Sequence, residues 1–124
     1  MTGINSLTAS ARLHYKTMFK RALVAVKGGW TQQVNARTAE GQVVSALDAK
    51  ARKYCTIGAI YASFAEQGKS SLSKAELPEK ALMYEIVTNR PELEHEYVSA
   101  WNDHPNRKKK DVVQLFKNII KDLE

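Results

Sequence analysis

Apolar residues recur at helical spacing along most of this chain and predict helices. The first predicted helix covers residues 8–27, where one face at about 100° per residue collects apolar side chains. These are Ala11, Tyr15, Met18, Phe19, Ala22 and Val26. Gly28 and Gly29 follow, and we expect them to end the helix in a left-handed cap position.

Four further helices are predicted downstream. Ser45 and Asp48 suggest a capping box for a second helix that runs to about residue 67 and stops at Gly68. A polar connector over 68–74 precedes a third helix over 78–89, with proline in its first turn. Residues 91–101 predict a short fourth helix, with Leu93, Tyr97 and Trp101 on one face. The last helix carries its apolar positions at Val112, Val113, Phe116, Ile119, Ile120 and Leu123.

One stretch alternates instead at a period of two. From Trp30 to Arg37, one set of alternate positions is Trp30, Gln32, Val34 and Ala36, and the positions between them are all polar. Gly41 follows, before Val43 and Val44. This pattern predicts a β-hairpin with Gly41 in its turn. We therefore expect a mainly α protein, a compact bundle of four to five helices with one small β-hairpin.

Composition fits one globular domain over residues 1–124, with residues 1–7 expected to be flexible. Hydrophobic residues make up 44% and charged residues 26% of the chain, as in ordinary folded proteins. Cys55 is the only cysteine, so an internal disulfide is excluded and a reducing compartment is favoured. The chain shows no signal-peptide pattern and no long apolar run. We expect a cytoplasmic protein that does not engage membranes, as a monomer or weak homodimer.

The net charge of +6 is unevenly distributed. Residues 1–39 carry six basic side chains and no acid, whereas residues 76–103 carry seven acids and two basic side chains. A basic excess favours an anionic partner, although the acidic middle can also neutralise the basic ends within the fold.

Three short blocks resemble a family of small bacterial and phage proteins with a Trp-X-Gln, Cys-X-X-Gly-Ala and Trp-Asn-Asp-X-Pro pattern. Here the blocks begin at Trp30, Cys55 and Trp101, and the resemblance covers residues 29 to about 116. It implies no established reaction, cofactor or catalytic residue. Two positions depart from the pattern. Gln33 stands where the family often has glycine, and Lys108 stands where a threonine often begins the last helix, so Asn106 or Asp103 is expected to cap it.

Candidate catalytic chemistry is sparse. We expect Cys55 to lie mid-helix on an apolar face near Gly58, buried and unreactive, because free cysteine is among the most buried residues. A serine there should cost about 1–3 kcal/mol. The three histidines have no metal-ligand spacing, so we expect no metal and no cofactor. Trp30 and Trp101 are interpreted as core anchors, with ligand stacking as the alternative.

The three blocks share a polar set, Gln32, Arg37, Asn102 and Asp103. The set is interpreted either as turn chemistry and a buried network or as a pocket between the hairpin and the Trp-Asn-Asp turn. A pocket would make the protein a small-ligand binder or an enzyme. Contact between Arg37 and Asp103 is one hypothesis for this arrangement.

Two basic groups are the candidate partner-binding residues: Arg12, Lys16, Lys20 and Lys27 in the first helix, and Arg107, Lys108, Lys109 and Lys110 before the last. Cations at a helix start oppose its dipole, which suggests an anionic ligand, although a solvated surface explains both groups as well. The favoured hypothesis is a non-enzymatic basic binding protein of bacterial or phage origin. It would engage an acidic protein surface or a nucleic-acid backbone, for instance as an anti-defence inhibitor.

Overall fold

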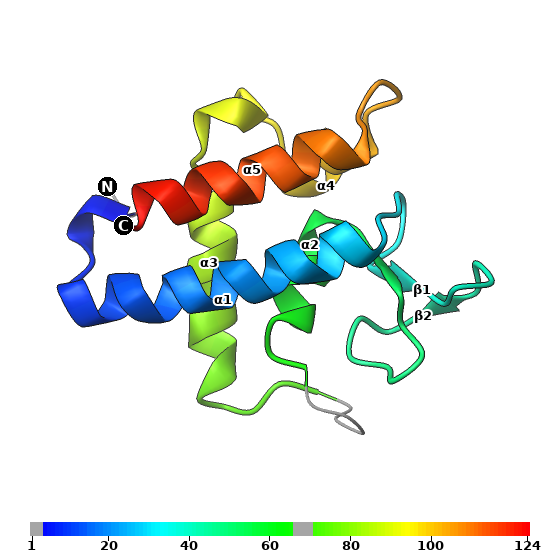
Figure 1. Cartoon of the computed structure of the whole chain (residues 1–124), viewed down its shortest axis with the longest axis horizontal. Coiled ribbons are helices and arrows are strands. Elements are labelled where there is room, and N and C mark those ends of the chain that lie inside the picture. The colour runs from blue at the N-terminus through cyan, green and yellow to red at the C-terminus, as the bar shows by residue number, and fades with distance from the viewer. Residues whose placement is uncertain (1–3, 66–70) are drawn as a thin grey trace.

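Five α-helices and a small sheet form the described parts of the chain, residues 4–65 and 71–124, in this computed structural model (Figure 1). The helices are α1 (Ala9–Gly28), α2 (Thr56–Ala62), α3 (Glu76–Thr88), α4 (Val98–Asp103) and α5 (Lys109–Asp122). Two 3₁₀ turns, η1 (Ile4–Ser6) and η2 (Pro91–Leu93), complete the helical part. The mainly α class with a minor β part is therefore confirmed. Of residues 1–7, residues 4–6 form η1, and residues 1–3 lie outside the described ranges.

The long helices α1 and α5 lie side by side and run in opposite directions, with α3 crossing behind them (Figure 1). Each buries the face that its periodicity predicts, because apolar side chains at helical spacing leave water together. Phe19 of α1 and Phe116 of α5 are both fully buried, and their ring centroids are 6.1 Å apart. This pair lies in the main core, which also takes side chains from α2, α3 and α4.

The predicted hairpin is present but short. Strand β1 (Ala36–Arg37) pairs antiparallel with β2 (Val43–Val44), and Gly41 in the turn has φ 94°. A third strand that the sequence pattern did not predict, β3 (Lys53–Tyr54), pairs with the other side of β1, so the strand order is β2-β1-β3. The predicted alternation from Trp30 breaks at Gln33, whose left-handed φ of 74° turns the chain.

Most of the predicted second helix is wrong. Residues 45–51 form turns, in which Ser45 Oγ accepts from the Leu47 N–H and Asp48 Oδ1 accepts from the Lys50 N–H. Such local bonds compete with a helix, and the helix itself begins only at Thr56 after β3. Its predicted end at residues 67 and 68 lies outside the described residues.

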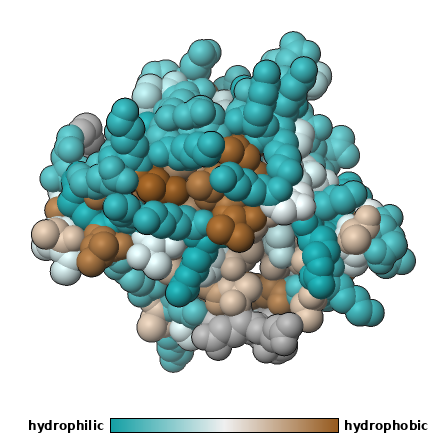
Figure 2. Space-filling view, in the orientation of Figure 1, coloured by the Kyte–Doolittle hydropathy of each residue, from teal (hydrophilic) through white to brown (hydrophobic). Residues whose placement is uncertain are grey.

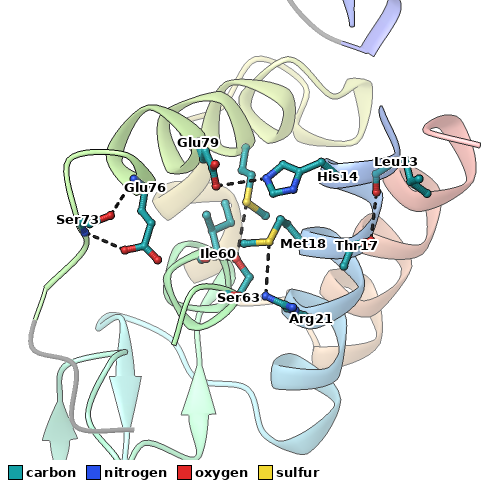
Figure 3. Close-up of polar contacts among 11 residues, drawn as sticks. Leu13, His14, Thr17, Met18, Arg21, Ile60, Ser63, Ser73, Glu76 and Glu79 are labelled. Atoms are coloured by element: carbon teal, nitrogen blue, oxygen red, sulfur yellow. Dashed lines mark hydrogen bonds and ion pairs between the residues drawn. The ribbon is translucent and has the colours of Figure 1, made fainter. Parts of the chain in front are cut away.

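The ends of α1 and α3 differ from expectation in their chemistry. Gly29 is extended, at φ 174°, so no left-handed cap forms. Glycine is required there for space, because a Cβ would lie 2.4 Å from the Arg52 carbonyl oxygen. Helix α3 begins two residues before Pro78, and Ser73 and Glu76 exchange hydrogen bonds at its start (Figure 3). This Ser-X-X-Glu capping box was readable from the sequence.

The predicted fourth helix over 91–101 is also wrong. Glu94 and His95 both adopt left-handed conformations, with φ of 51° and 68°, so the chain changes direction between η2 and α4. Trp101 Nε1 donates to the Glu92 carbonyl oxygen at 3.1 Å across this bend. Leu93 and Trp101 are buried as predicted, but Tyr97 is 80% exposed because the bend removes it from their face.

Polar contacts also join the helices around α2 and α3. Ser63 Oγ lies 2.6 Å from the Ile60 carbonyl oxygen and 3.7 Å from Met83 Sδ, and His14 Nε2 lies 3.3 Å from Glu79 Oε2 (Figure 3). The first two contacts lie at the end of α2, which they join to α3, and the third joins α3 to the first half of α1.

Candidate functional site: a buried polar network and a lysine surface

Asn102 is the centre of a buried hydrogen-bond network at the end of α4. Its side-chain oxygen accepts from Trp30 Nε1 at 3.0 Å, from the Thr56 N–H at 2.9 Å and from Thr56 Oγ1 at 2.7 Å. Its side-chain nitrogen donates to the Thr31 carbonyl oxygen and to Asp103 Oδ1. Both Asn102 and Thr56 are buried. One amide therefore ties α4 to the start of α2 and to the segment after α1.

Gln32 and Asp103 extend this network towards the surface. Gln32 Nε2 donates to the carbonyl oxygens of Asn102 and His104, both at 3.1 Å. Asp103 Oδ1 accepts from the Gln33 N–H at 2.8 Å, which holds Gln33 in its left-handed conformation. The three sequence blocks thus meet through side-chain and backbone hydrogen bonds.

Arg37 lies apart from this network. Its guanidinium donates to Thr31 Oγ1 at 3.0 Å and to the Gly41 carbonyl oxygen at 3.1 Å, so it closes the hairpin turn. The hypothesised contact with Asp103 is wrong, because the guanidinium is directed to the Thr31 hydroxyl and the Gly41 carbonyl oxygen instead.

The expected pocket between hairpin and turn is small. A cavity of about 60 Å³ touches Asn102 and Asp103 of the predicted set, together with Cys55 and Asn35. Every buried side-chain nitrogen and oxygen in the described residues has a hydrogen-bond partner. Such an arrangement is typical of a network that holds the fold together.

A larger hollow of about 890 Å³ lies between β2, the following turn and the start of α3. Val43, Val44, Leu47, Leu72 and Leu77 supply most of its apolar lining. Tyr61 is the only titratable side chain among its described lining residues, so these residues offer little for acid–base chemistry.

Cys55 is buried, but it is not in the middle of a helix. It is the N-cap of α2, and its Sγ accepts from the Gly58 N–H at 3.2 Å and lies 3.7 Å from Asn35 Oδ1. Burial raises the pKa of the thiol above its ordinary value, against the smaller opposing effect of backbone hydrogen bonds. A helix start favours a thiolate, but burial outweighs it here, and the raised pKa disfavours a thiolate nucleophile at neutral pH. Gly58 allows close approach of the hairpin segment, since a Cβ would lie 1.8 Å from the Asn35 carbonyl oxygen.

Three of the predicted partner-binding cations are engaged within the fold. Arg12 donates to the carbonyl oxygens of Ile4 at 2.7 Å and Asp122 at 2.8 Å. Lys16 Nζ lies 3.5 Å from Glu124 Oε1. Arg107 donates to the Trp101 carbonyl oxygen at 2.7 Å, and its guanidinium stacks 4.1 Å from the centre of the Trp101 ring. The two arginines therefore serve the fold, and Arg12 and Lys16 mark the side of α1 that faces α5.

The remaining lysines of the two long helices are exposed. On α1, Lys20 and Lys27 follow Arg12 and Lys16 along the side that faces α5, at about 100° per residue. On α5, Lys109 and Lys117 lie on the side away from η2, because Asn118 and Asp122 on the other side bond Glu92 and Arg90. We call Lys20, Lys27, Lys109, Lys110 and Lys117 the lysine face.

Acids are absent from this surface of the two helices. Helix α1 contains none, and the two acids of α5 lie on its far side. Asp122 Oδ2 is 2.6 Å from Arg90, and Asp111 Oδ2 accepts from the Lys108 N–H at 2.9 Å as the cap of α5. Lys108 is thus the N-cap residue, and neither Asn106 nor Asp103 caps this helix.

Apolar groups lie between the two rows of lysines. Figure 2 shows hydrophobic residues along the middle of the face formed by α1 and α5, bordered by hydrophilic ones. Leu23 and Val113 are partly buried against the core there, and an open hollow of about 560 Å³ lies over Val113, between Lys109, Lys110 and Lys117. Lys117 was not among the predicted residues, although its spacing from Lys110 and Val113 was available in the sequence.

Comparisons with known proteins place the chain in a family without assigning a reaction. Among the described residues, no cluster of histidine, cysteine, aspartate and glutamate side chains is arranged to hold a metal ion. No helix in the described ranges is long and apolar enough to cross a bilayer. No curated protein and no solved structure matches the chain. A family model described as "Family of unknown function (DUF6197)" matches residues 19–122, and the chain belongs to this family.

Proposed function

We propose that this protein is a binding protein whose partner is an anionic macromolecule, engaged through the lysine face. The observation that carries the proposal is the convergence of lysines from α1 and α5 on one surface to which neither helix contributes an acid. Residues about ninety positions apart in the sequence form this surface, and the pairing of the two helices is what assembles it.

The arrangement favours an external partner over mere solubility. Like charges on neighbouring helices repel, and each exposed pair costs a few tenths of a kcal/mol. The acids of α5 are used on the opposite side, so the repulsion on the lysine face is not relieved within these helices. An anionic partner relieves it. Lys20 and Lys27 lie about 10 Å apart along α1, and Lys109 and Lys117 about 12 Å apart along α5, from the helical rise.

The polar network does not compete with this assignment. The polar side chains of this network form hydrogen bonds within the protein, which supports the structural interpretation of Gln32, Asn102 and Asp103. The anionic partner is accordingly sought on the surface of α1 and α5.

The test is a charge-matched pair of variants. Lys20, Lys27 and Lys117 are changed to glutamine in one variant. In the other, Lys50, Lys74 and Lys80, which belong to neither α1 nor α5, are changed to glutamine; both variants lower the net charge from +6 to +3. Binding to an 18-base-pair DNA duplex and to an acidic helical peptide is measured by fluorescence anisotropy at 50 and 200 mM salt.

We expect the first variant to lose affinity for at least one probe, while the second binds as the wild type does. Three phosphate contacts make the affinity for DNA fall by roughly 40-fold between these salt concentrations, and the first variant should lack this part of the salt dependence. Equal binding by the two variants would show that only net charge matters and would refute the proposal.

A further inference from the structure

We infer that the partner is an acidic amphipathic α-helix of another protein, which lies along the line where α1 and α5 meet and covers the hollow over Val113 of α5. This inference rests on the proposed function and specifies the partner of the same surface. It follows from the apolar groups between the lysines, which a polymer of phosphates alone would leave unused.

The surface over this line has the chemistry to bind a helix. Two packed helices have axes about 8–10 Å apart, and a third helix about 10 Å wide can lie over the line where they meet. The floor of this line is apolar, because Leu23 of α1 and Val113 of α5 are partly buried against the core there. The hollow over Val113 lies on the α5 side of the line and is open to solvent. Helices that bind such surfaces place apolar side chains at i, i+4 and i+7 into the floor.

Further apolar surface continues along α1. Val24 is 69% exposed and Leu13 is 65% exposed, and at 100° per residue both fall next to the lysines of α1 on its outer face. They are eleven residues apart, which is about 16 Å, or three turns. Large apolar side chains so exposed beside a row of lysines indicate a contact surface for a partner.

The lysines on both sides of the floor require a partner helix with negative charge. Lysines occupy both rims, as the flanking charged positions do in paired helices, so glutamates or aspartates on either side of the partner's apolar stripe meet them. The stems of Lys109, Lys110 and Lys117 add apolar contact while their amines reach the rim.

Nucleic acid fits these observations less well. All six arginines donate hydrogen bonds within the protein, so the bidentate forks that read bases are engaged elsewhere. The phenyl and phenol rings of α1 and α5 are buried, so they are not free to stack on bases; these are Tyr15, Phe19 and Phe116. In such a complex the exposed apolar side chains would face phosphates and make no favourable contact.

The experiment compares four probes against the wild-type protein. One is an 18-residue amidated peptide of leucine, glutamate and alanine, with leucines at i, i+4, i+7 and i+11. The second has the same composition in an order that scatters the leucines around the helix. The third is the 18-base-pair duplex, and the fourth is a vesicle containing anionic lipid. We expect the first peptide to bind at least about tenfold more tightly than the second and more tightly than the duplex or the vesicle.

Shape-conserving variants test the apolar surface, with Val113 on the floor and Val24 on the exposed surface of α1 beside it. Val24→Thr together with Val113→Thr should weaken binding of the first peptide about tenfold or more, because hydroxyl groups enter an apolar contact. Val43→Thr, at a valine that is 60% exposed on β2, is the matched control and should leave binding unchanged. Unfolding temperatures measured alongside show whether the double variant stays folded.

The outcomes separate the two proposals. Suppose that the lysine variant loses binding. The acidic-helix inference is then overturned by equal binding of both peptides, by tighter binding of the duplex or vesicle, or by no effect of the two valine changes. The lysine face stays in place in each of these cases. Binding that is insensitive to the lysine variant overturns both.

Discussion

Replacing Asn102 with leucine should destabilise the protein far more than its single side chain suggests. Leucine has a similar volume but offers no acceptor for the three donors that converge on the amide oxygen. Thr56 is fully buried, so its N–H and hydroxyl lose their partner where water cannot replace it. Each buried unsatisfied group costs about 1–3 kcal/mol. The Trp30 N–H is partly exposed and costs less.

The expected loss is about 3 kcal/mol after a modest gain from burying leucine. For a chain of this length it corresponds to a fall of roughly 10–20 °C in Tm, and it is a large fraction of an ordinary domain's stability. Urea unfolding followed by circular dichroism gives the free energy directly. Gln32→Met, which removes two hydrogen bonds at the edge of the network, is the comparison and should cost less than about 1 kcal/mol.

Two results would refute this reasoning. The first is a free energy of unfolding for Asn102→Leu within 1 kcal/mol of the wild type. The second is additivity with Thr56→Val, because the hydroxyl and the amide form one unit and their losses should overlap in a double-mutant cycle. Agreement with both expectations would establish the network as structural.

Three further predictions follow from single positions. Gly58→Ala should lower stability by more than 2 kcal/mol, since its Cβ would strike the Asn35 carbonyl, whereas Gly28→Ala, with nothing within 4 Å, should be neutral or stabilising; equal urea midpoints would contradict this. Gln33→Gly should be tolerated or raise the Tm, because a left-handed φ of 74° favours glycine, and a clear fall in Tm would count against that conformation. Burial alone would raise the pKa of Glu92, but hydrogen bonds from an arginine and an asparagine lower it below its ordinary value. The stability that Glu92→Gln loses at pH 7 should therefore disappear as the pH falls through that lowered pKa. A stability difference between variant and wild type that stays constant down to pH 2 would contradict this.

The two long helices could be predicted from the sequence because their apolar faces obey one period over many turns. Helix α1 begins at Ala9, one residue after the Thr8 cap, and buries five of the six residues predicted for its face. Helix α5 buries most of its predicted stripe, although Val113 is only partly buried. In such elements the packing that stabilises the structure leaves its pattern in the sequence.

The middle of the chain could not be predicted in this way. Between Ser45 and Tyr54 the apolar residues fill turns and a two-residue strand, too short for any period to show. Glu94 and His95 adopt left-handed conformations that glycine or asparagine would have signalled. The helix break at residues 94–97 is therefore set by tertiary contacts such as the Trp101–Glu92 hydrogen bond.

The candidate sites could likewise be predicted only in part from the sequence. The sequence identified three block residues, Gln32, Asn102 and Asp103. Their hydrogen-bond partners are backbone groups and Thr56, which no pattern of side chains in the sequence predicts. Arg37 shares a block with Gln32 yet serves the hairpin turn. The lysine face could be found only in part, because the sequence shows each row of lysines separately. The pairing of α1 with α5 places Lys117 on the same surface as Lys20 and Lys27.

The position of Cys55 reverses an expectation about its replacement. In an apolar helix face a serine would be costly, but at the N-cap of α2 its oxygen can accept the Gly58 N–H that sulfur now accepts at 3.2 Å and donate to Asn35 Oδ1. Serine is a preferred N-cap, and alanine at such a position costs about 1 kcal/mol. Cys55→Ser should therefore unfold within about 0.5 kcal/mol of the wild type in urea, while Cys55→Ala should lose about 1–2 kcal/mol. If serine proves less stable than alanine, the apolar surroundings outweigh the cap, and the hydrogen bond to Gly58 contributes little to the start of this helix.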